Sequence, residues 1–219
     1  MPSTLALDPA RVRLPENQEQ PIDLFYAFAY ISDRQEGLVI VNVATLVDGN
    51  PENNFLNKDV VFNPDGVLTG ASFVAAAGHR LYITTPRGLA IVDVSDPMHP
   101  HLAGELGGNF LRNPHCVAIQ FRYAFVTDDD GLKVLDITDP VRPIPVRKGF
   151  VRLGNAGRLY VARTYAYVAN GPEGLAIVDV ENPERPRLDQ MFSAGGAIND
   201  ARAVQIGSVN ASQFALVAD

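Results

Sequence analysis

The chain has one cysteine, Cys116, among its 219 residues, so no disulfide can form within it. No stretch approaches the roughly 20 apolar residues that a membrane-spanning helix needs. The N-terminal residues also lack the basic start and the apolar run of a signal peptide. We therefore expect no transmembrane segment. The compartment stays open, because many exported proteins also lack disulfides.

Clusters of basic residues are also missing. The 18 lysines and arginines are scattered, and the net charge is −7, which argues against broad nucleic-acid binding. The sequence has no Gly-x-Ser-x-Gly elbow, no phosphate-binding glycine loop and no His-Glu-x-x-His helix. These absences remove the commonest signatures of hydrolases, nucleotide-binding enzymes and metalloproteases.

A seven-residue phrase is present four times. Its copies are Gly37-Leu-Val-Ile-Val-Asn-Val43, Gly88-Leu-Ala-Ile-Val-Asp-Val94, Gly131-Leu-Lys-Val-Leu-Asp-Ile137 and Gly174-Leu-Ala-Ile-Val-Asp-Val180. The last three copies begin 43 residues apart. A period of this length in an all-strand sequence is typical of propeller blades.

The third repeat shows the expected blade most clearly. Residues 115–119 and 123–127 predict the first two strands, and 132–137 the third. Pro140 then interrupts the ladder, and 145–150 supply a shorter, more polar outer strand. The glycine that opens the third strand suits a hairpin position with positive φ. The near-continuous apolar phrase implies burial on both faces, which stacked blades provide.

We therefore predict an all-β fold, a β-propeller of four-stranded antiparallel blades, four complete plus part of a fifth. The expected single domain spans 1–219, with blades at approximately 10–70, 71–112, 113–154, 155–198 and 199–219. Residues 10–14 resemble 201–206, so both are predicted first strands. Since the sequence stops after a second strand, we favour a fragment of a longer protein. Closure with strands from the N-terminus is the alternative.

The run Gly88-Leu-Ala-Ile-Val-Asp-Val-Ser-Asp-Pro97 resembles the LVIVD repeat, a propeller-type repeat of bacterial and archaeal proteins. The third and fourth copies match nearly as well, whereas the first has Asn42 in place of the aspartate and lacks the Asp-Pro end. The resemblance covers about residues 10–219 and implies a propeller scaffold. It also implies a location outside the cytoplasm, at the cell surface or exported. It implies no shared catalytic chemistry.

Two groups of aspartates invite a functional reading. Asp93, Asp136 and Asp179 recur at one repeat position, where we expect each to accept backbone N–H bonds in the turn that follows. Ligands around the ring are the alternative. Asp128, Asp129 and Asp130 lack the spacing of a calcium loop, and we expect their tight turn to direct the carboxylates into water.

Metal binding is not predicted. His99, His101, His115 and Cys116 do not show the spacings from which three or four ligands converge. We expect the first two histidines at the rim and the cysteine as a small buried hydrophobe on an inner strand. No cofactor is predicted either.

The starts of the innermost strands carry the principal candidate site. Arg11, His115, Arg158 and Arg202 occupy roughly equivalent repeat positions, with Ser72 in the second blade. They predict a cationic collar at one mouth of the central channel, suited to a carboxylate, a phosphate or an acidic partner segment. The alternative is that they pair with carboxylates of the turns and bind nothing.

A second candidate is the polar insertion of the first blade, which includes Asp48, Asn50, Glu52, Asn53 and Asn54. It is either a plain surface loop or a loop that contacts a partner, because insertions into repeats often bind.

The function predicted from these features is a non-catalytic scaffold. It would present blade-edge loops and the channel mouth to an unidentified protein or cell-surface partner. The alternative is an exported enzyme or an enzyme-associated propeller, with an anion- or metal-binding site at the channel mouth. That alternative survives the missing motifs because a propeller can assemble its site from several blades.

Overall fold

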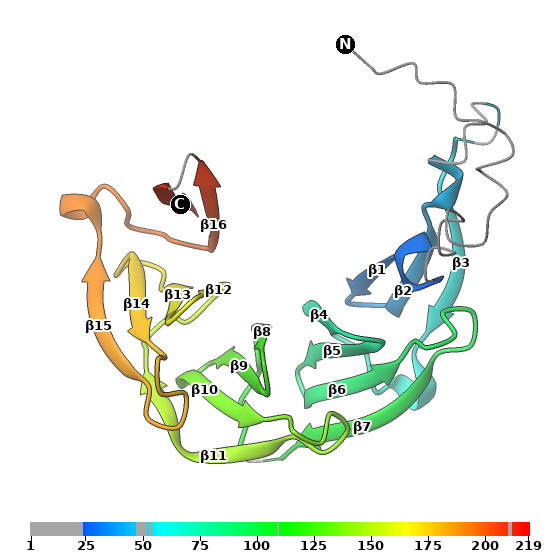
Figure 1. Cartoon of the computed structure of the whole chain (residues 1–219), viewed down its shortest axis with the longest axis horizontal. Coiled ribbons are helices and arrows are strands. Elements are labelled where there is room, and N and C mark those ends of the chain that lie inside the picture. The colour runs from blue at the N-terminus through cyan, green and yellow to red at the C-terminus, as the bar shows by residue number, and fades with distance from the viewer. Residues whose placement is uncertain (1–23, 47–51, 53, 109, 210–211) are drawn as a thin grey trace, which may run out of the picture.

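The computed structural model describes residues 24–46, 52, 54–108, 110–209 and 212–219. These residues form antiparallel sheets that follow one another around an open arc (Figure 1). No α-helix is present in these ranges. Four short 3₁₀ segments lie wholly within them: η2 (Leu24–Ala27), η3 (Ala44–Leu46), η5 (Pro64–Gly66) and η6 (Ala194–Gly196). The all-β propeller architecture is confirmed.

Three complete sheets occupy the middle of the arc. Each contains four strands that are consecutive in the chain, with the first strand nearest the centre of the arc and the fourth outermost (Figure 1). They are β4 (Phe73–Ala77), β5 (Arg80–Thr85), β6 (Gly88–Asp93) and β7 (His101–Gly107); β8 (Cys116–Gln120), β9 (Tyr123–Asp128), β10 (Gly131–Asp136) and β11 (Ile144–Arg152); and β12 (Leu159–Ala162), β13 (Tyr165–Ala169), β14 (Leu175–Asp179) and β15 (Arg187–Phe192).

The two end sheets have fewer strands among the described residues. The first contains three strands, which correspond to the second to fourth strands of a blade: β1 (Phe28–Asp33), β2 (Gly37–Asn42) and β3 (Asn57–Phe62). Its expected first strand, 10–14, lies outside the described residues. The last contains β16 (Ala203–Val209) and β17 (Ser212–Ala218), an inner and a second strand. Four blades and part of a fifth therefore account for the five sheets.

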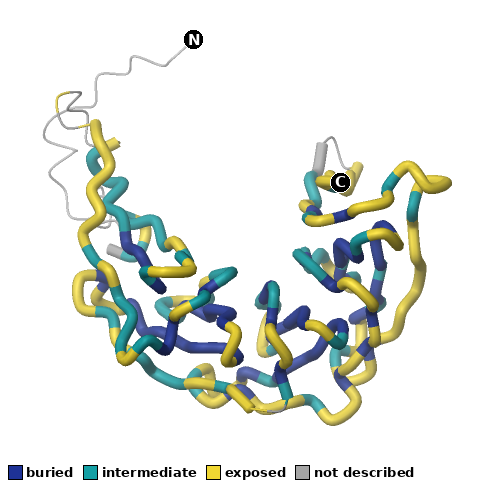
Figure 2. The backbone as a smooth tube through the Cα atoms, turned by 180° about the vertical axis from the view of Figure 1, so that it is seen from behind, coloured by how far each residue is buried: buried dark blue, intermediate teal, exposed yellow. Residues whose placement is uncertain are grey.

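The core lies within and between the blades, where the repeated apolar phrase is packed. Leu132 and Val134 of β10 join Phe125 of β9 and residues of the next blade in one buried cluster. Figure 2 shows burial concentrated in the middle strands, whereas β15 is exposed along its length. Burial on both faces of the central strands is thus achieved by stacking blades.

The hairpin glycines adopt the predicted positive φ, as at Gly131 (φ 140°). A Cβ atom there would lie 2.2 Å from the Val151 carbonyl oxygen, so no other residue fits without moving the outer strand. One expectation about that strand is wrong. β11 runs over nine residues rather than 145–150, because a register shift opposite Lys133 and Leu135 lets it continue to Arg152.

Candidate functional site

The residue immediately before the innermost strand is the key position in four successive sheets. Ser72 precedes β4, His115 precedes β8, Arg158 precedes β12 and Arg202 precedes β16. All four line one cavity of about 570 Å³, together with Arg34, Asp128 and Asp129. We call this cavity the channel mouth. The structure thus brings together the described members of the predicted collar, whereas Arg11 lies outside the described residues.

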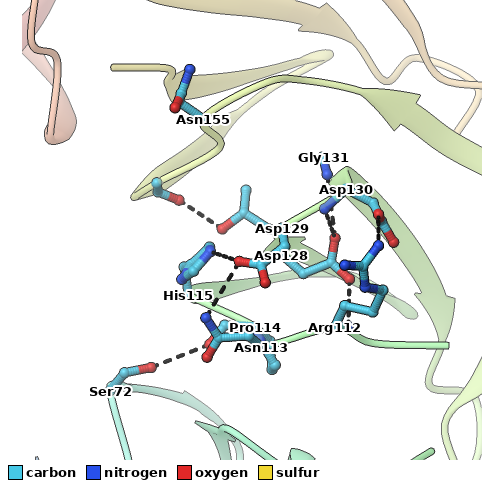
Figure 3. A network of polar contacts seen from close by, with 12 residues as sticks. Ser72, Arg112, Asn113, Pro114, His115, Asp128, Asp129, Asp130, Gly131 and Asn155 are labelled. Atoms are coloured by element: carbon cyan, nitrogen blue, oxygen red, sulfur yellow. Dashed lines mark hydrogen bonds and ion pairs between the residues drawn. The ribbon is translucent and has the colours of Figure 1, made fainter. Parts of the chain in front are cut away.

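Two of the mouth residues are paired with carboxylates, His115 with Asp129 of the β9–β10 turn and Arg202 with the nearby Asp200. Nε2 of His115 lies 2.9 Å from Oδ1 of Asp129, and Asn113 donates to the same oxygen (Figure 3). Nε of Arg202 donates to Asp200 over 2.9 Å. The Arg202 charge is therefore partly balanced within the chain, and the His115 ring is held by Asp129.

Arg158 is held without any carboxylate. Its Nη2 donates to the Ser72 carbonyl oxygen over 3.1 Å, and its guanidinium lies 4.6 Å from the centre of the Phe73 ring. These partners belong to the second blade, so Arg158 reaches from the fourth blade past β8, which lies between β4 and β12 (Figure 1). Its Nη1 is buried and has no hydrogen-bond partner among the described residues. An unpaired buried donor of this kind is costly.

Arg34 is a mouth residue that the sequence analysis missed. It lies in the turn between β1 and β2, is exposed, and its side chain makes no hydrogen bond or ion pair within the described part of the chain. The β1–β2 turn corresponds to the Asp128–Asp130 turn of the third blade. Aligning the turns that follow the second strands, and not only the starts of the first strands, would have found it.

The expectation that all three consecutive aspartates point into water is wrong for Asp128, whereas Asp129 is exposed and Asp130 is half-buried. Asp128 is 0% exposed. It accepts hydrogen bonds from the backbone N–H groups of Arg112, Asp130 and Gly131 (Figure 3). The physical reason is Lys133, whose Nζ lies 2.6 Å from Asp128 and 2.9 Å from Asp130 inside the blade.

The buried lysine is stabilised by this network. Burial opposes its charge, but the hydrogen bonds to Asp128 and Asp130 outweigh that effect and raise the pKa of Lys133. The same ammonium lowers the pKa of Asp130. The signal in the sequence was a lysine inside an apolar phrase, because a buried lysine requires a carboxylate partner. The network is structural and fixes the turn that borders the channel mouth.

The recurring aspartates behave as predicted. Oδ1 of Asp93, Asp136 and Asp179 accepts the backbone N–H two residues later over 2.8, 2.8 and 2.9 Å. Asn42 makes the same bond to Ala44 over 3.0 Å, so the first repeat keeps the turn without the aspartate. These hydrogen bonds lower the pKa of Asp136, with Thr138 as the donor through its hydroxyl and its backbone N–H. This repeat position therefore stabilises the turn that follows the third strand in the first four sheets.

The remaining candidate groups do not converge. His99 bonds to Asp96 in the turn after β6, while His101 begins β7 and lies 3.6 Å from Asp93. Cys116 is buried on β8, and burial raises the pKa of its thiol, so the sulfur is held in its unreactive protonated form. Within the described ranges no three His, Cys, Asp or Glu residues are arranged to hold a metal ion.

The described residues of the polar insertion do not line the channel mouth. Asp48, Asn50 and Asn53 fall outside the described residues, whereas Glu52 and Asn54 are exposed between η3 and β3. The insertion follows the end of β2 that pairs with the start of β1, and Arg34 follows the opposite end of β1. Arg34 and the start of the insertion therefore follow opposite ends of the β1–β2 pair.

The repeat decides the family. The LVIVD repeat profile matches residues 23–51, 70–106, 115–148 and 153–193, which together make up more than half of the chain. The chain belongs to the LVIVD repeat family. The four matched ranges fall in the first four sheets, although β3 lies between two of them, and the two strands of the last sheet lie outside the match. No curated protein matches the sequence of this LVIVD repeat chain. No helix in its described ranges is both long enough and apolar enough to cross a membrane.

Solved structures show the same fold at low identity. The computationally designed Ika8 protein matches with a TM-score of 0.58 and 11% identity over 83% of this chain and 50% of its own. A functionally unknown protein from Desulfotomaculum acetoxidans DSM 771 matches at 0.55, with 11% identity, 83% coverage of this chain and 61% of its own. The N-terminal domain of Nup159 matches with a TM-score of 0.50 and 12% identity, over 84% of this chain and 48% of its own. The LVIVD repeat chain spans about half the length of these structures.

Proposed function

We propose that this LVIVD repeat protein is a non-catalytic scaffold that binds a protein partner at the channel mouth through an acidic side chain of that partner. The observation that carries the proposal is the pair of mouth arginines without a carboxylate, Arg34 and Arg158, in a chain of net charge −7. Arginine offers a planar set of donors that matches a carboxylate in two-point geometry. An acidic group would also reduce the repulsion between the two guanidinium groups.

The chemistry of the surrounding groups supports binding rather than reaction. The only thiol is buried and protonated, and the His115 ring is occupied by Asp129. The Asp128 carboxylate is saturated by three backbone donors and Lys133. None of these groups is arranged as a nucleophile beside a base, which covalent or general-base catalysis requires.

The proposal is tested with a fluorescent hexaglutamate peptide as an acidic probe, by anisotropy at low and moderate salt. Arg34→Gln should weaken binding about fivefold to tenfold, because it removes an exposed charge that contacts no other group. Arg202→Gln should have a smaller effect, since Asp200 already shares its charge.

Arg163→Gln supplies the matched control. Arg163 is an exposed arginine in the turn between β12 and β13, at the other end of β12 from Arg158, and it does not line the mouth. Equal binding by the wild type, Arg34→Gln and Arg163→Gln would refute a binding role of the channel mouth. A single acidic metabolite that raises the melting temperature more than any peptide would instead favour the enzyme alternative.

A further inference from the structure

A second, apolar cavity continues from the channel mouth along the innermost strands. Its volume is about 830 Å³, and its lining includes Phe73, Ile119, Leu159, Val161, Val204 and Leu216. In four sheets the polar residue before the inner strand lines the mouth, and the residues that follow it line this apolar cavity. The space along the innermost strands is therefore polar at the mouth and apolar farther along the strands.

Arg158 is the residue that the two cavities share. Its guanidinium carries the buried Nη1 that lacks a hydrogen-bond partner within the described ranges, while Leu159 and Val161 beyond it face the apolar cavity. A cationic donor at the boundary of an apolar space favours a ligand whose anionic group and apolar group are adjacent.

The walls of the apolar cavity also carry hydrogen-bonding groups of the backbone. β4, β8 and β12 each pair with a neighbour on one side only, and their other edge faces the centre of the arc (Figure 1). Leu159 of β12 uses its N–H and C=O in contacts with the Cys116 sulfur. The remaining N–H and C=O groups of a free strand edge can bond to an extended peptide but not to an alkyl chain. This observation favours a peptide over a fatty acid.

We infer that the ligand of the channel is an extended peptide segment in which an acidic residue is adjacent to a run of bulky apolar residues. The acidic side chain contacts Arg158 and Arg34 at the mouth, and the apolar side chains lie against Ile119, Val161 and Leu216. The inference rests on the proposed function and adds the composition of the partner segment.

Three labelled probes test it: hexaglutamate, the peptide Glu-Glu-Glu-Leu-Leu-Leu, and the same peptide with glutamine in place of glutamate. The mixed acidic and apolar peptide should bind the wild-type chain at least tenfold more tightly than either of the other two. Leu216→Ser should reduce that gain at least threefold, because Leu216 is exposed and lines the cavity. Leu188→Ser on β15 is the matched control, since Leu188 is a similarly exposed leucine outside the cavity.

The outcomes separate the two proposals. Hexaglutamate that binds as well as the mixed peptide would overturn this inference and leave the proposed function standing. No binding of hexaglutamate, together with equal binding of the glutamine and glutamate peptides, would overturn the acidic partner itself. Binding of dodecanoate without binding of the mixed peptide would show that the ligand is a lipid and overturn the peptide assignment.

Discussion

The third blade and the last sheet begin with nearly the same pair of strands but end in different environments. Phe125 of β9 and Leu216 of β17 occupy the same position of the second-strand phrase. Phe125 is 0% exposed and Leu216 is 64% exposed. The third blade adds β10 and β11 outside its second strand, whereas the described last sheet has no strand beyond β17. The strand phrase thus determines the backbone conformation, while burial comes from the neighbouring strands and blades.

The largest difference in stability is expected when the side chains of Phe125 and Leu216 are each truncated. Phe125→Ala should lower the free energy of unfolding by about 4 kcal/mol, because it opens a cavity in a packed cluster. Leu216→Ala should change it by less than about 0.5 kcal/mol, because the side chain is already in solvent. Urea unfolding of both variants measures the two values. An equal loss of unfolding free energy in the two variants would mean that the Leu216 side chain is buried when the protein is in solution.

The ion pairs of the two regions provide a second contrast. Asp128→Ala should destabilise the chain by roughly 3 kcal/mol, because it leaves Lys133 buried with only Asp130 and a carbonyl oxygen as partners. Asp200→Ala breaks the exposed pair with Arg202 and should leave the urea midpoint unchanged. A Lys133→Met, Asp128→Ala double variant that recovers most of the loss would confirm that the unpaired charge is the cause.

A smaller effect is expected from acid. The hydrogen bond from Lys133 lowers the pKa of Asp130 below its usual 3.8. A carboxyl group with a lower pKa in the folded state stabilises that state when ionised, and the contribution is lost as the pH falls below 3.8 through the lower folded value. Between about pH 5 and pH 2, Asp130→Asn should therefore lose less stability than the wild type. An identical pH profile would show that the Lys133 contact contributes nothing.

The sequence predicted the parts of the fold that recur within it. The Gly-Leu phrase located the third strands, and Asp93, Asp136 and Asp179 were recognised as turn residues because each has the same local role. Such features depend on hydrogen bonds between residues close in the chain. Their prediction needs no knowledge of how the blades are placed around the arc.

The features that the sequence did not reveal depend on contacts between distant segments. Arg158 bonds to Ser72, which lies 86 residues earlier in the chain, so its position could not be read from its neighbours. Arg34 was missed because it reaches the mouth from a turn after a second strand rather than before a first strand. The burial of Asp128 was not predicted because it depends on the ion pair with Lys133, which lies on the following strand, β10. The sequence therefore predicted which repeat position lines the site. It did not predict which of the charged side chains there are paired with an opposite charge.

The bond between Arg158 and Ser72 also has a consequence for the order of folding. Each described sheet pairs only strands that are consecutive in the chain, so a blade can form as soon as its own residues are available. The Arg158 contact has to wait until the fourth blade has begun and the third is already in place between its partners. Once formed, the contact ties the start of the fourth blade directly to the second blade, so the two cannot separate without breaking it.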